Sequence, residues 1–484
     1  MSQINTMRIQ PGSHQPVPAH QPPMKSLSAY GKRSLNTDQV IQHLTRSGTR
    51  FKDRDGDGKT QVSVKLDAFT EQQKTCARRA LQSWQDVADI SFHENARAPD
   101  GSIQISGSDR MGGGVAWGPS GRNSAARALV GTQQASPAPK EGSYFHTTMV
   151  HEIGHCLGLA HPGAYNGGGS YERDAKFAQD TRAGTVMSYW SERKNADHNF
   201  KGVLPSAPMM YDIAAIQSIY GANRKTRNTD TTYGFNSNTG REVLSLKSAA
   251  DSAVFCVWDG GGNDTLDFSG YAQNQKINLN AQSFSDVGGM RGNVSIAKGV
   301  TLENAVGGPG DDVLTGNDAD NRLKGGAGAD RLRGGVGADT FVYDKASDST
   351  PHNPDLIEDF TSGTDKIDVS GALREAGVKG LTFSSQFNGR PGNAVLSHDA
   401  STGRGSLAID MSGNGKPDLL VNTVGKIQPG DIVTGGAAPA PAPTPTPTPT
   451  PVPEPDALGM LTSLLQGTLM MLQGLLRLLG TGKP

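Results

Sequence analysis

The sequence has little cysteine and almost no net charge, and both features exclude classes of protein. Its three cysteines are an odd number spread over 484 residues, which argues against a disulfide-stapled scaffold. The 46 basic and 47 acidic residues give a formal net charge of −1, and no run of like charge stands out. We therefore expect no nucleic-acid partner and no electrostatic membrane patch.

The N-terminal segment lacks the apolar stretch of a secretory signal. Residues 1–33 are polar and rich in proline, so we expect no cleavable N-terminal signal peptide. The segment is either a tail or a short pro-segment. The whole chain is too long for one core, so two or more domains are expected.

The stretch HEIGHCLGLAHPG begins at His151 and predicts a catalytic metal site. On a helix, His151 and His155 lie one turn apart on the same face, so both imidazoles can reach one ion. Glu152 can hydrogen-bond a water at the metal without being a ligand. Gly158 can end the helix in a left-handed conformation, and His161 then returns as a third ligand. Three protein ligands and an open position are typical of catalytic zinc.

A second motif follows in the run Thr-Val-Met-Ser-Tyr-Trp that ends at Trp190. Met187 stands where metzincin metalloproteases have the methionine turn, an apolar floor beneath the metal. Tyr189 matches the tyrosine that in the serralysin branch reaches zinc as an extra, displaceable ligand.

Three segments resemble the sequences of serralysins, which are secreted bacterial zinc proteases: VHEIGHCLGLAHPG, FAQDTRAGTVMSYWSE and YDIAAIQSIYGAN. The resemblance implies an α+β metzincin-type catalytic domain with one Zn²⁺, which hydrolyses protein substrates with broad specificity. It implies that Glu152 is the general base, and that Tyr189 leaves the metal to hydrogen-bond the oxyanion. It also implies export by a type I secretion machinery to the outside of the cell.

The cysteines leave alternatives open. Cys156 lies inside the zinc motif, but three histidines already account for the metal, so a small buried apolar role is favoured over ligation. Cys76 and Cys156 can pair only if their helices touch, and the state of Cys256 is equally open.

A ninefold repeat follows further along the chain. Residues 307–342 divide into GGPGDDVLT, GNDADNRLK, GGAGADRLR and GGVGADTFV, with an apolar eighth residue in each. Such repeats predict a parallel β-roll (RTX domain) in which glycines form tight turns and aspartates share several Ca²⁺ ions between adjacent loops. The predicted ligand positions here are Gly308, Gly310, Asp312, Gly325, Gly326, Gly328, Asp330, Gly335, Gly337 and Asp339.

The serralysin resemblance extends the calcium sites upstream. One implied site takes Arg227, Asp230, Thr232, Asp259, Gly261 and Asp264, and a second takes Gly262, Asp264, Thr301 and Glu303.

We expect a catalytic domain at 34–222 and the all-β roll at 223–436. A Pro/Ala/Thr-rich linker at 437–455 and an amphipathic helix at 456–484 follow. That helix self-associates, lies on a membrane surface or serves as a displaced export signal. Two rival functions stay open: a calcium-dependent adhesion protein with a vestigial protease domain, and a protease that carries a membrane-active tail.

Local patterns predict the elements around the motif. Helices are expected from Ser34, over 70–90 and over 212–220, and strands over 62–66 and 102–106. Residues 53–58 are expected to form an acidic turn, with adventitious calcium as the minor alternative. In the family, the strand near 102–106 lies at the sheet edge, where substrate pairs. Residues 112–142 are expected to be loops.

Overall fold

The computed structural model describes residues 31–120, 124–133 and 135–435. The predicted linker and C-terminal helix therefore lie outside the described residues, as does nearly all of the N-terminal segment. No helix in the described part of the chain is long and apolar enough to cross a membrane.

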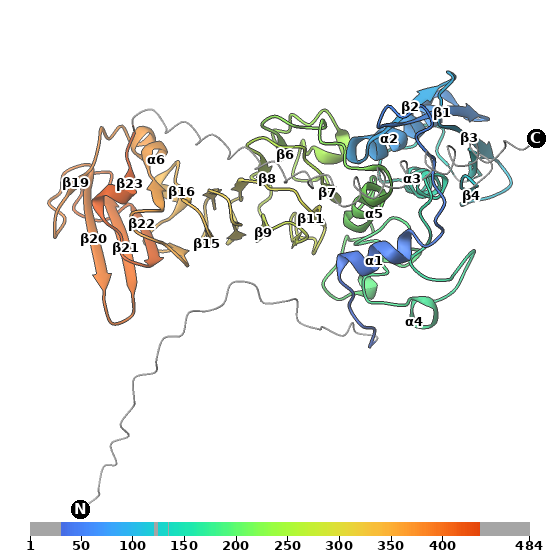
Figure 1. Ribbon diagram of the computed structural model, residues 1–484. Helices are drawn as coiled ribbons and strands as arrows, with labels where there is room; N and C mark the ends of the chain where they lie inside the picture. Colours follow the sequence, from blue (N-terminus) through green and yellow to red (C-terminus); the bar gives the residue numbers. More distant parts are fainter. Residues whose placement is uncertain (1–30, 121–123, 134, 436–484) are drawn as a thin grey trace, which may run out of the picture. The chain divides into compact units, whose positions relative to one another are not determined.

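A five-stranded sheet forms one layer of the N-terminal region (Figure 1). Its order is β2 (Ile90–Glu94), β1 (Thr60–Asp67), β3 (Gly101–Ser108), β5 (Ala125–Gly131), β4 (Gly114–Trp117). All neighbours are parallel except β4, which runs antiparallel to β5. Alternate side chains of β1 are buried, as period-two patterning requires.

Two expectations about this sheet are wrong. The strand near 102–106 is β3, and it lies in the interior of the sheet between β1 and β5. The edge position belongs to β4, which falls with β5 inside the segment expected to be loops. The glycines at 112–114 made the strand hard to predict, because glycine weakens a strand and usually occurs in one only where a neighbouring group approaches closely.

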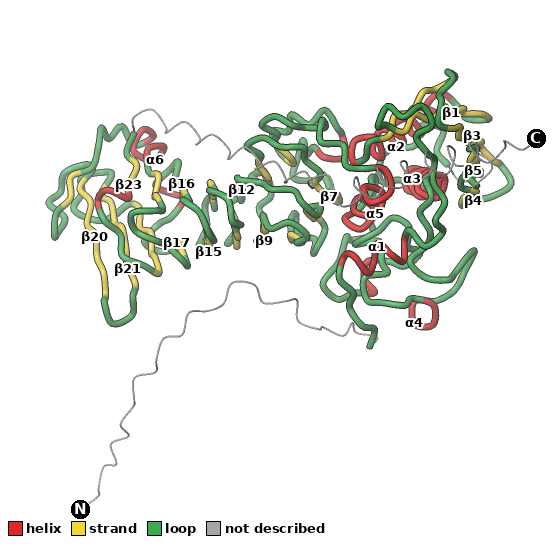
Figure 2. Tube along the Cα trace, viewed as in Figure 1, coloured by secondary structure: helices red, strands yellow, loops and turns green. Residues whose placement is uncertain are grey.

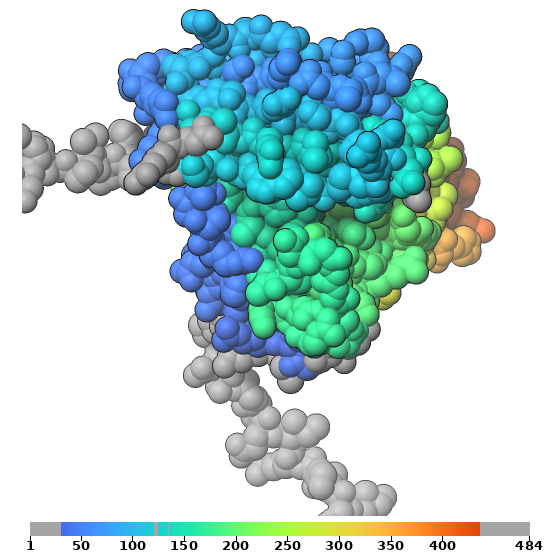
Figure 3. All heavy atoms as spheres, turned by 90° about the vertical axis from the view of Figure 1, so that its right-hand side faces the viewer, coloured from blue at the N-terminus to red at the C-terminus, as the bar shows by residue number. Residues whose placement is uncertain are grey.

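Two helices pack against the sheet, and the second of them carries the first two histidines of the zinc motif. Helix α2 (Glu71–Val87) begins with a capping box between Thr70 and Gln73. Helix α3 (Tyr144–Cys156) is capped by Ser143, and the Trp84 indole of α2 donates to the Val150 carbonyl of α3 at 3.1 Å. Figure 3 shows the lighter blue and cyan residues above the green segment that follows α3, and the darkest blue residues, which begin the described chain, beside that segment.

The remaining helices of this region agree with the sequence patterns, with small shifts of their ends. Helix α5 begins two residues before the predicted start, because the Asp212 side chain caps the backbone of Met209. The elements are α1 (Thr37–Leu44), α4 (Tyr171–Asp174), η1 (Glu192–Lys194) and α5 (Met210–Tyr220).

Most strands of the second region are short, parallel and joined by turns, as Figure 2 shows, whereas three longer strands within residues 393–424 pair antiparallel. Successive strands alternate between two sheets, so residues 18 apart stack: Leu314 pairs with Leu332, and Leu323 with Phe341. These four side chains are fully buried. The nonapeptide phase therefore gives the parallel β-roll that the sequence predicts.

One sheet contains β23 (Ile432–Val433), β18 (Lys366–Asp368), β16 (Thr340–Val342), β14 (Arg322–Lys324), β12 (Asn304–Val306), β8 (Thr265–Asp267) and β6 (Thr232–Gly234). The other contains β19 (Thr382–Phe383), β20 (Asn393–Asp399), β21 (Arg404–Asp410), β22 (Leu419–Val424), β17 (Asp355–Ile357), β15 (Arg331–Arg333), β13 (Val313–Thr315) and β9 (Lys276–Asn278). A third, small sheet contains β10 (Phe284–Ser285), β11 (Val294–Ile296) and β7 (Phe255–Val257). Short helices η2 (Glu242–Leu244), η3 (Ala346–Asp348), α6 (Ser370–Glu375) and η4 (Pro429–Asp431) complete this region.

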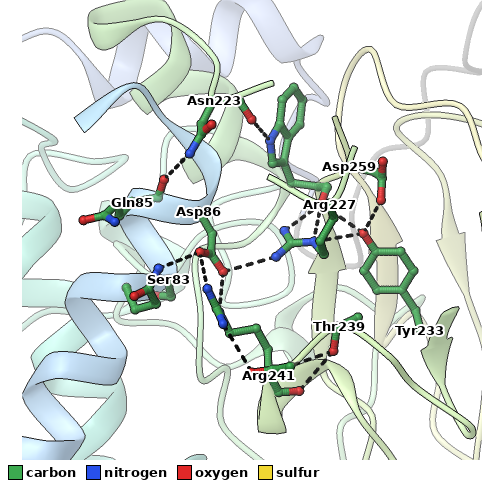
Figure 4. Close-up of polar contacts among 12 residues, drawn as sticks. Ser83, Gln85, Asp86, Asn223, Arg227, Tyr233, Thr239, Arg241 and Asp259 are labelled. Atoms are coloured by element: carbon green, nitrogen blue, oxygen red, sulfur yellow. Dashed lines mark hydrogen bonds and ion pairs between the residues drawn. The ribbon is translucent and has the colours of Figure 1, made fainter. Parts of the chain in front are cut away.

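A buried ion-pair network joins the two regions (Figure 4). Asp86 of α2 accepts from Arg227 at 3.1 Å and from Arg241 at 2.7 and 2.8 Å. Arg227 also donates to the Trp258 carbonyl and the Tyr233 hydroxyl. The guanidinium of Arg227 is therefore engaged at the junction, and only its carbonyl could serve a calcium ion.

Candidate metalloprotease site

Three imidazoles of the zinc motif converge on one point. The Nε2 atom of His161 lies 3.2 Å from Nε2 of His151 and 3.0 Å from Nε2 of His155. On the far side of each ring, Nδ1 lies 2.7–2.9 Å from a backbone carbonyl, that of Val186, Leu159 or Tyr165.

These carbonyls fix the tautomer of every ring. A carbonyl accepts only, so each Nδ1 carries the proton and each Nε2 presents a bare lone pair. Burial lowers the pKa of His161 to about 3 and the pKa values of the other two as well, so all three rings are neutral. Three lone pairs facing one another repel unless a cation lies between them. The donor set fits one zinc ion with three protein ligands and an open position.

Two glycines let the backbone bring the ligands together. Gly158 has φ +101°, and a Cβ there would meet the Thr49 carbonyl at 2.1 Å. Gly154 lies inside α3, where a Cβ would meet the Met187 sulfur at 2.7 Å. The predicted methionine turn therefore lies directly under the helix that carries two ligands, and Met187 is fully buried. A glycine in the interior of a predicted helix often marks a close packing contact, so Gly154 could have been found from the sequence.

Glu152 lies against the edge strand. Its side chain is buried, and burial raises its pKa to about 8. Its Oε2 atom has no hydrogen-bond partner among the described residues. A Cβ on Gly114 of β4 would meet Oε1 at 2.4 Å, so only glycine lets the strand approach this carboxylate.

Tyr189 stands beside the histidines. Its ring centroid lies 4.5 Å from that of His161 and 5.8 Å from that of His151. Its hydroxyl accepts a long hydrogen bond, 3.5 Å, from the Gly167 amide. Burial raises the pKa of Tyr189, so the hydroxyl is protonated and can donate.

Asp212 supports the site from α5, and the sequence analysis missed it. Its carboxylate accepts from the Thr185 hydroxyl at 2.6 Å and from the amides of Val186 and Met209 at 2.7 and 2.9 Å. Burial raises the pKa of Asp212 to about 7. Because the Val186 carbonyl orients His151, Asp212 fixes both the methionine turn and one ligand.

Arg46 also supports the site, and the sequence did not reveal it because Arg46 lies far from the zinc motif along the chain. Its guanidinium donates to the carbonyls of His161 and Gly163 and so holds the loop after α3. Only tertiary structure brings these residues together.

The predicted calcium positions gather in the turns of the roll. The Asp312 amide donates to Asp330, and the Asp330 amide donates to Asp355 of the next coil. Oδ2 of Asp330 and Oδ2 of Asp355 are buried without a hydrogen-bond partner in the described chain. Burial raises the pKa of Asp330 to about 8 and that of Asp355 to about 9. Buried carboxylates of this kind fit Ca²⁺, which takes oxygen ligands.

The glycines of these turns permit the close stacking. Gly326, Gly328, Gly335 and Gly337 have positive φ, and a Cβ on Gly325 would meet Asp330 Oδ2 at 2.0 Å. Gly308 and Gly310 have no Cβ, which allows the backbone of residues 271–274 to approach closely. Asp339 repeats the role of Asp330 against Asp365. Asp355 and Asp365 lie outside the repeats, which explains why the ninefold period did not reveal them.

The predicted upstream calcium positions also lie close together, with Thr301 as the exception. The Thr231 amide donates to Asp264 at 2.8 Å, and the Asp264 amide donates to Glu303 at 2.7 Å. Tyr233 donates to Asp259 at 2.7 Å, and the Asn263 amide donates to Asp230. The remaining predicted positions in these loops are Gly261 and Gly262, both with positive φ, Thr232 at the start of β6, and Thr301, whose side chain is exposed.

The acidic turn and the cysteines take simple forms. The carboxylates of Asp53, Asp55 and Asp57 lie close together but exposed, and each accepts backbone amides of its own turn. All three cysteines are free and buried, so Cys76 and Cys156, whose pairing the sequence left open, are not joined by a disulfide.

The chain matches two family models. Residues 222–434 match the description "Peptidase M10 serralysin C terminal", and residues 48–203 match "Metallo-peptidase family M12B Reprolysin-like". The second match spans the sheet and the three histidines, and the first spans the roll.

Curated relatives cover most of the chain. The metallopeptidase AprA of Pseudomonas marginalis is 48% identical over 447 residues, which are 84% of this chain and 93% of that protein. The serralysin of Photorhabdus luminescens is 47% identical and covers 74% of this chain and 78% of its own length. Serralysin C of Dickeya chrysanthemi is 46% identical, with 75% and 80% covered.

Solved structures give a weaker likeness. The AlgE6R2 subunit of the Azotobacter vinelandii mannuronan C5-epimerase is 22% identical with a TM-score of 0.25, and covers 37% of this chain and 96% of its own. This likeness is too low to carry an argument. The relatives, the two family matches and the three-histidine site together establish that the chain belongs to the serralysin family and is a zinc metalloendopeptidase.

Proposed function

We propose that His151, His155 and His161 hold the catalytic zinc and that Glu152 is the general base. The observation that carries this assignment is the meeting of three bare Nε2 lone pairs beside the buried Glu152 carboxylate, whose Oε2 atom has no hydrogen-bond partner in the described part of the chain. Zinc, when bound there, supplies Lewis-acid polarisation of the scissile carbonyl and acidifies water. Glu152 accepts the proton of the attacking water and returns it to the leaving amine, a contribution of about 10²- to 10⁴-fold.

Tyr189 completes the proposed machinery as an extra, displaceable zinc ligand. Its ring lies edge-on to His161 and tilted against His151, and among the described residues its hydroxyl has one long hydrogen bond, from the Gly167 amide. A loosely held phenol can turn toward the substrate and donate to the oxyanion as negative charge develops. Met187 forms the apolar floor of the site and takes no part in proton transfer.

We infer that substrates bind along the edge strand β4. Within the described residues, β4 pairs with β5 on one side only. An extended peptide can add to the open side through backbone hydrogen bonds, which read no side chains and so favour broad specificity. Because Gly114 lies against Glu152, a peptide on this edge passes the general base.

The roll is proposed to bind several calcium ions and to order only when they are present. The supporting observation is the row of buried carboxylates with raised pKa values, which calcium would neutralise. Calcium is scarce inside cells, so such a chain would pass a type I secretion machinery unfolded and fold outside. The proposed domain boundaries remain 34–222 and 223–436.

Hydrolysis of unfolded casein tests the function. In calcium, wild type should cleave peptide bonds, and both a zinc chelator and Glu152→Ala should abolish cleavage while circular dichroism stays native. Cleavage that survives Glu152→Ala at the native rate would remove the general base from the proposal. Deletion of 437–484, assayed separately for cleavage and for vesicle binding, isolates any activity of the C-terminal segment.

A further inference from the structure

The edge strand β4 ends in an exposed aromatic side chain. Trp117 is the last residue of β4 and is 43% exposed. The four residues of the strand are Gly-Val-Ala-Trp, which include no charged residue and no proline. Exposed edges of sheets usually carry such residues, because charge and proline discourage pairing with a further strand. The open side of β4 lacks this protection and is therefore suited to receive a peptide strand.

The register of the sheet places Trp117 on the outer face. Trp117 pairs with Arg127 of β5, and Arg127 pairs with Gln104 of β3. All three residues are exposed. The alternate residues Ala126 and Ala128 of β5 are buried, on the face that packs against α3. Trp117 is thus an aromatic residue at the edge of an outer face whose next two positions are polar.

Arg127 orients the indole of Trp117. The guanidinium carbon of Arg127 lies 4.1 Å from the centroid of the Trp117 ring, which is a cation–π contact. Because Arg127 approaches from β5, it covers the face of the indole that is turned toward the interior of the sheet. The opposite face is left for a group on the open side of β4.

The distance between Trp117 and the catalytic carboxylate is set by the strand. A Cβ on Gly114 would meet Oε1 of Glu152 at 2.4 Å, and Trp117 follows Gly114 by three residues, or roughly 10 Å of strand. Antiparallel pairing is the more stable kind. In an antiparallel peptide, the residue opposite Trp117 comes three residues before the residue opposite Gly114. Directly opposed side chains share one face of a sheet, so this substrate side chain meets the open face of the indole.

We propose that Trp117 forms a substrate subsite for a bulky apolar side chain, above all an aromatic one, on the N-terminal side of the scissile bond. The inference rests on the proposed binding of substrates along β4. An apolar side chain buries surface against the indole, and an aromatic ring adds a ring–ring contact. One such contact changes kcat/KM by roughly 3- to 10-fold. The subsite therefore biases cleavage without removing the broad specificity that backbone pairing gives.

A peptide scan with the full chain in zinc and calcium tests the subsite. Fluorogenic peptides of one length carry phenylalanine or serine at each of the four positions before the scissile bond. At one of these positions, wild type should cleave the phenylalanine peptide roughly 3- to 10-fold more efficiently than the serine peptide. Trp117→Ala should remove this preference and leave kcat/KM for the serine peptide nearly unchanged.

Leu129→Ala is the matched control. Leu129 is 37% exposed on the same outer face, but it lies on β5, one strand further from the open edge. This variant should keep the preference of wild type. Absence of any preference in wild type, its survival in Trp117→Ala, or its equal loss in Leu129→Ala would overturn the subsite.

Peptide binding separates this proposal from the catalytic one. Fluorescence anisotropy of labelled peptides on a Glu152→Gln background measures affinity without cleavage. The phenylalanine peptide should bind roughly 3- to 10-fold more tightly than the serine peptide, and addition of Trp117→Ala should make the two affinities equal. If wild type cleaves no peptide, the catalytic proposal fails while this difference in affinity still tests the subsite. Equal affinities before the Trp117→Ala substitution would overturn the subsite alone.

Discussion

The histidine site and the roll, which we propose to bind calcium, differ in how much of their structure the polypeptide itself fixes. At the histidine site, three backbone carbonyls orient three rings, and helix α3 is held by a large side-chain core that includes Trp84 and Met187. In the roll, the strands are three residues long and each repeat buries one large apolar side chain. The catalytic site is therefore organised by protein packing, whereas the roll depends on the ions that it would bind.

The buried carboxylates explain why the roll depends more on bound ions than the histidine site does. Oxygen atoms of Asp264, Asp330 and Asp355 are buried without hydrogen-bond partners, and a buried ionised carboxylate is costly unless it is paired or coordinates a metal. At the histidine site the ligands are neutral imidazoles whose rings are held by backbone carbonyls, so loss of the metal costs less there than it does where ionised carboxylates are buried. Zinc removal should therefore abolish catalysis, and calcium removal should strongly destabilise the roll at neutral pH.

The largest expected effect is on catalysis at Glu152. Glu152→Gln keeps the shape of the side chain but removes its basicity, so kcat/KM for a peptide substrate should fall by about 10²- to 10⁴-fold. Circular dichroism and zinc content should stay native. Glu172→Gln is the control, since Glu172 is half exposed and pairs only with Lys194 on the surface. A similar fall in both variants would mean that the loss is not specific to the general base.

Tyr189→Phe should act on the transition state. Removal of one oxyanion donor costs about 10²- to 10³-fold in kcat. The ring contacts with the histidines remain in phenylalanine, so KM and zinc affinity should change little. Steady-state kinetics on a fluorogenic peptide separates the two parameters, and an effect confined to KM would assign Tyr189 to substrate binding instead.

Loss of the junction carboxylate tests the dependence of one region on the other. Asp86→Ala leaves the guanidiniums of Arg227 and Arg241 without their carboxylate, and breaking a buried ion pair costs about 3–5 kcal/mol. Urea unfolding in calcium should show a clearly lower midpoint. Asp38→Ala breaks an exposed pair with Lys298 and should cost at most about 1 kcal/mol. Equal losses would show that the buried network is no stronger than a surface pair.

The pH dependence of the roll is the smallest effect and has a definite sign. Burial and, after it, repulsion from neighbouring aspartates raise the pKa values of Asp330 and Asp355 to about 8 and about 9. In the absence of calcium, these protonated groups favour the folded state below pH 4, and that stability is lost as pH rises to about 8–9. Melting of calcium-free protein should therefore fall in temperature from pH 5 to pH 9. Calcium should remove this trend, and a rise in stability with pH without calcium would contradict it.

Sequence patterns predict those features that depend on local spacing. The helix with His151 and His155, the methionine turn at Met187 and the phase of Leu323 in the roll each follow from a fixed period or motif. The edge strand β4 could not be predicted, because its register is set by pairing with β5 and its glycine by the approach of Glu152. Asp212 also escaped, because its role depends on contacts 26 and 27 residues away.

Hydrogen exchange tests the contrast between the two regions most directly. Amide exchange of the full chain should be followed in calcium and after a calcium-selective chelator, with zinc retained. The account predicts that β13, β14, β15 and β16 lose protection on chelation while the amides of α3 stay protected. Roll strands that remain protected without calcium would contradict it, because the chain alone would then hold both regions in place.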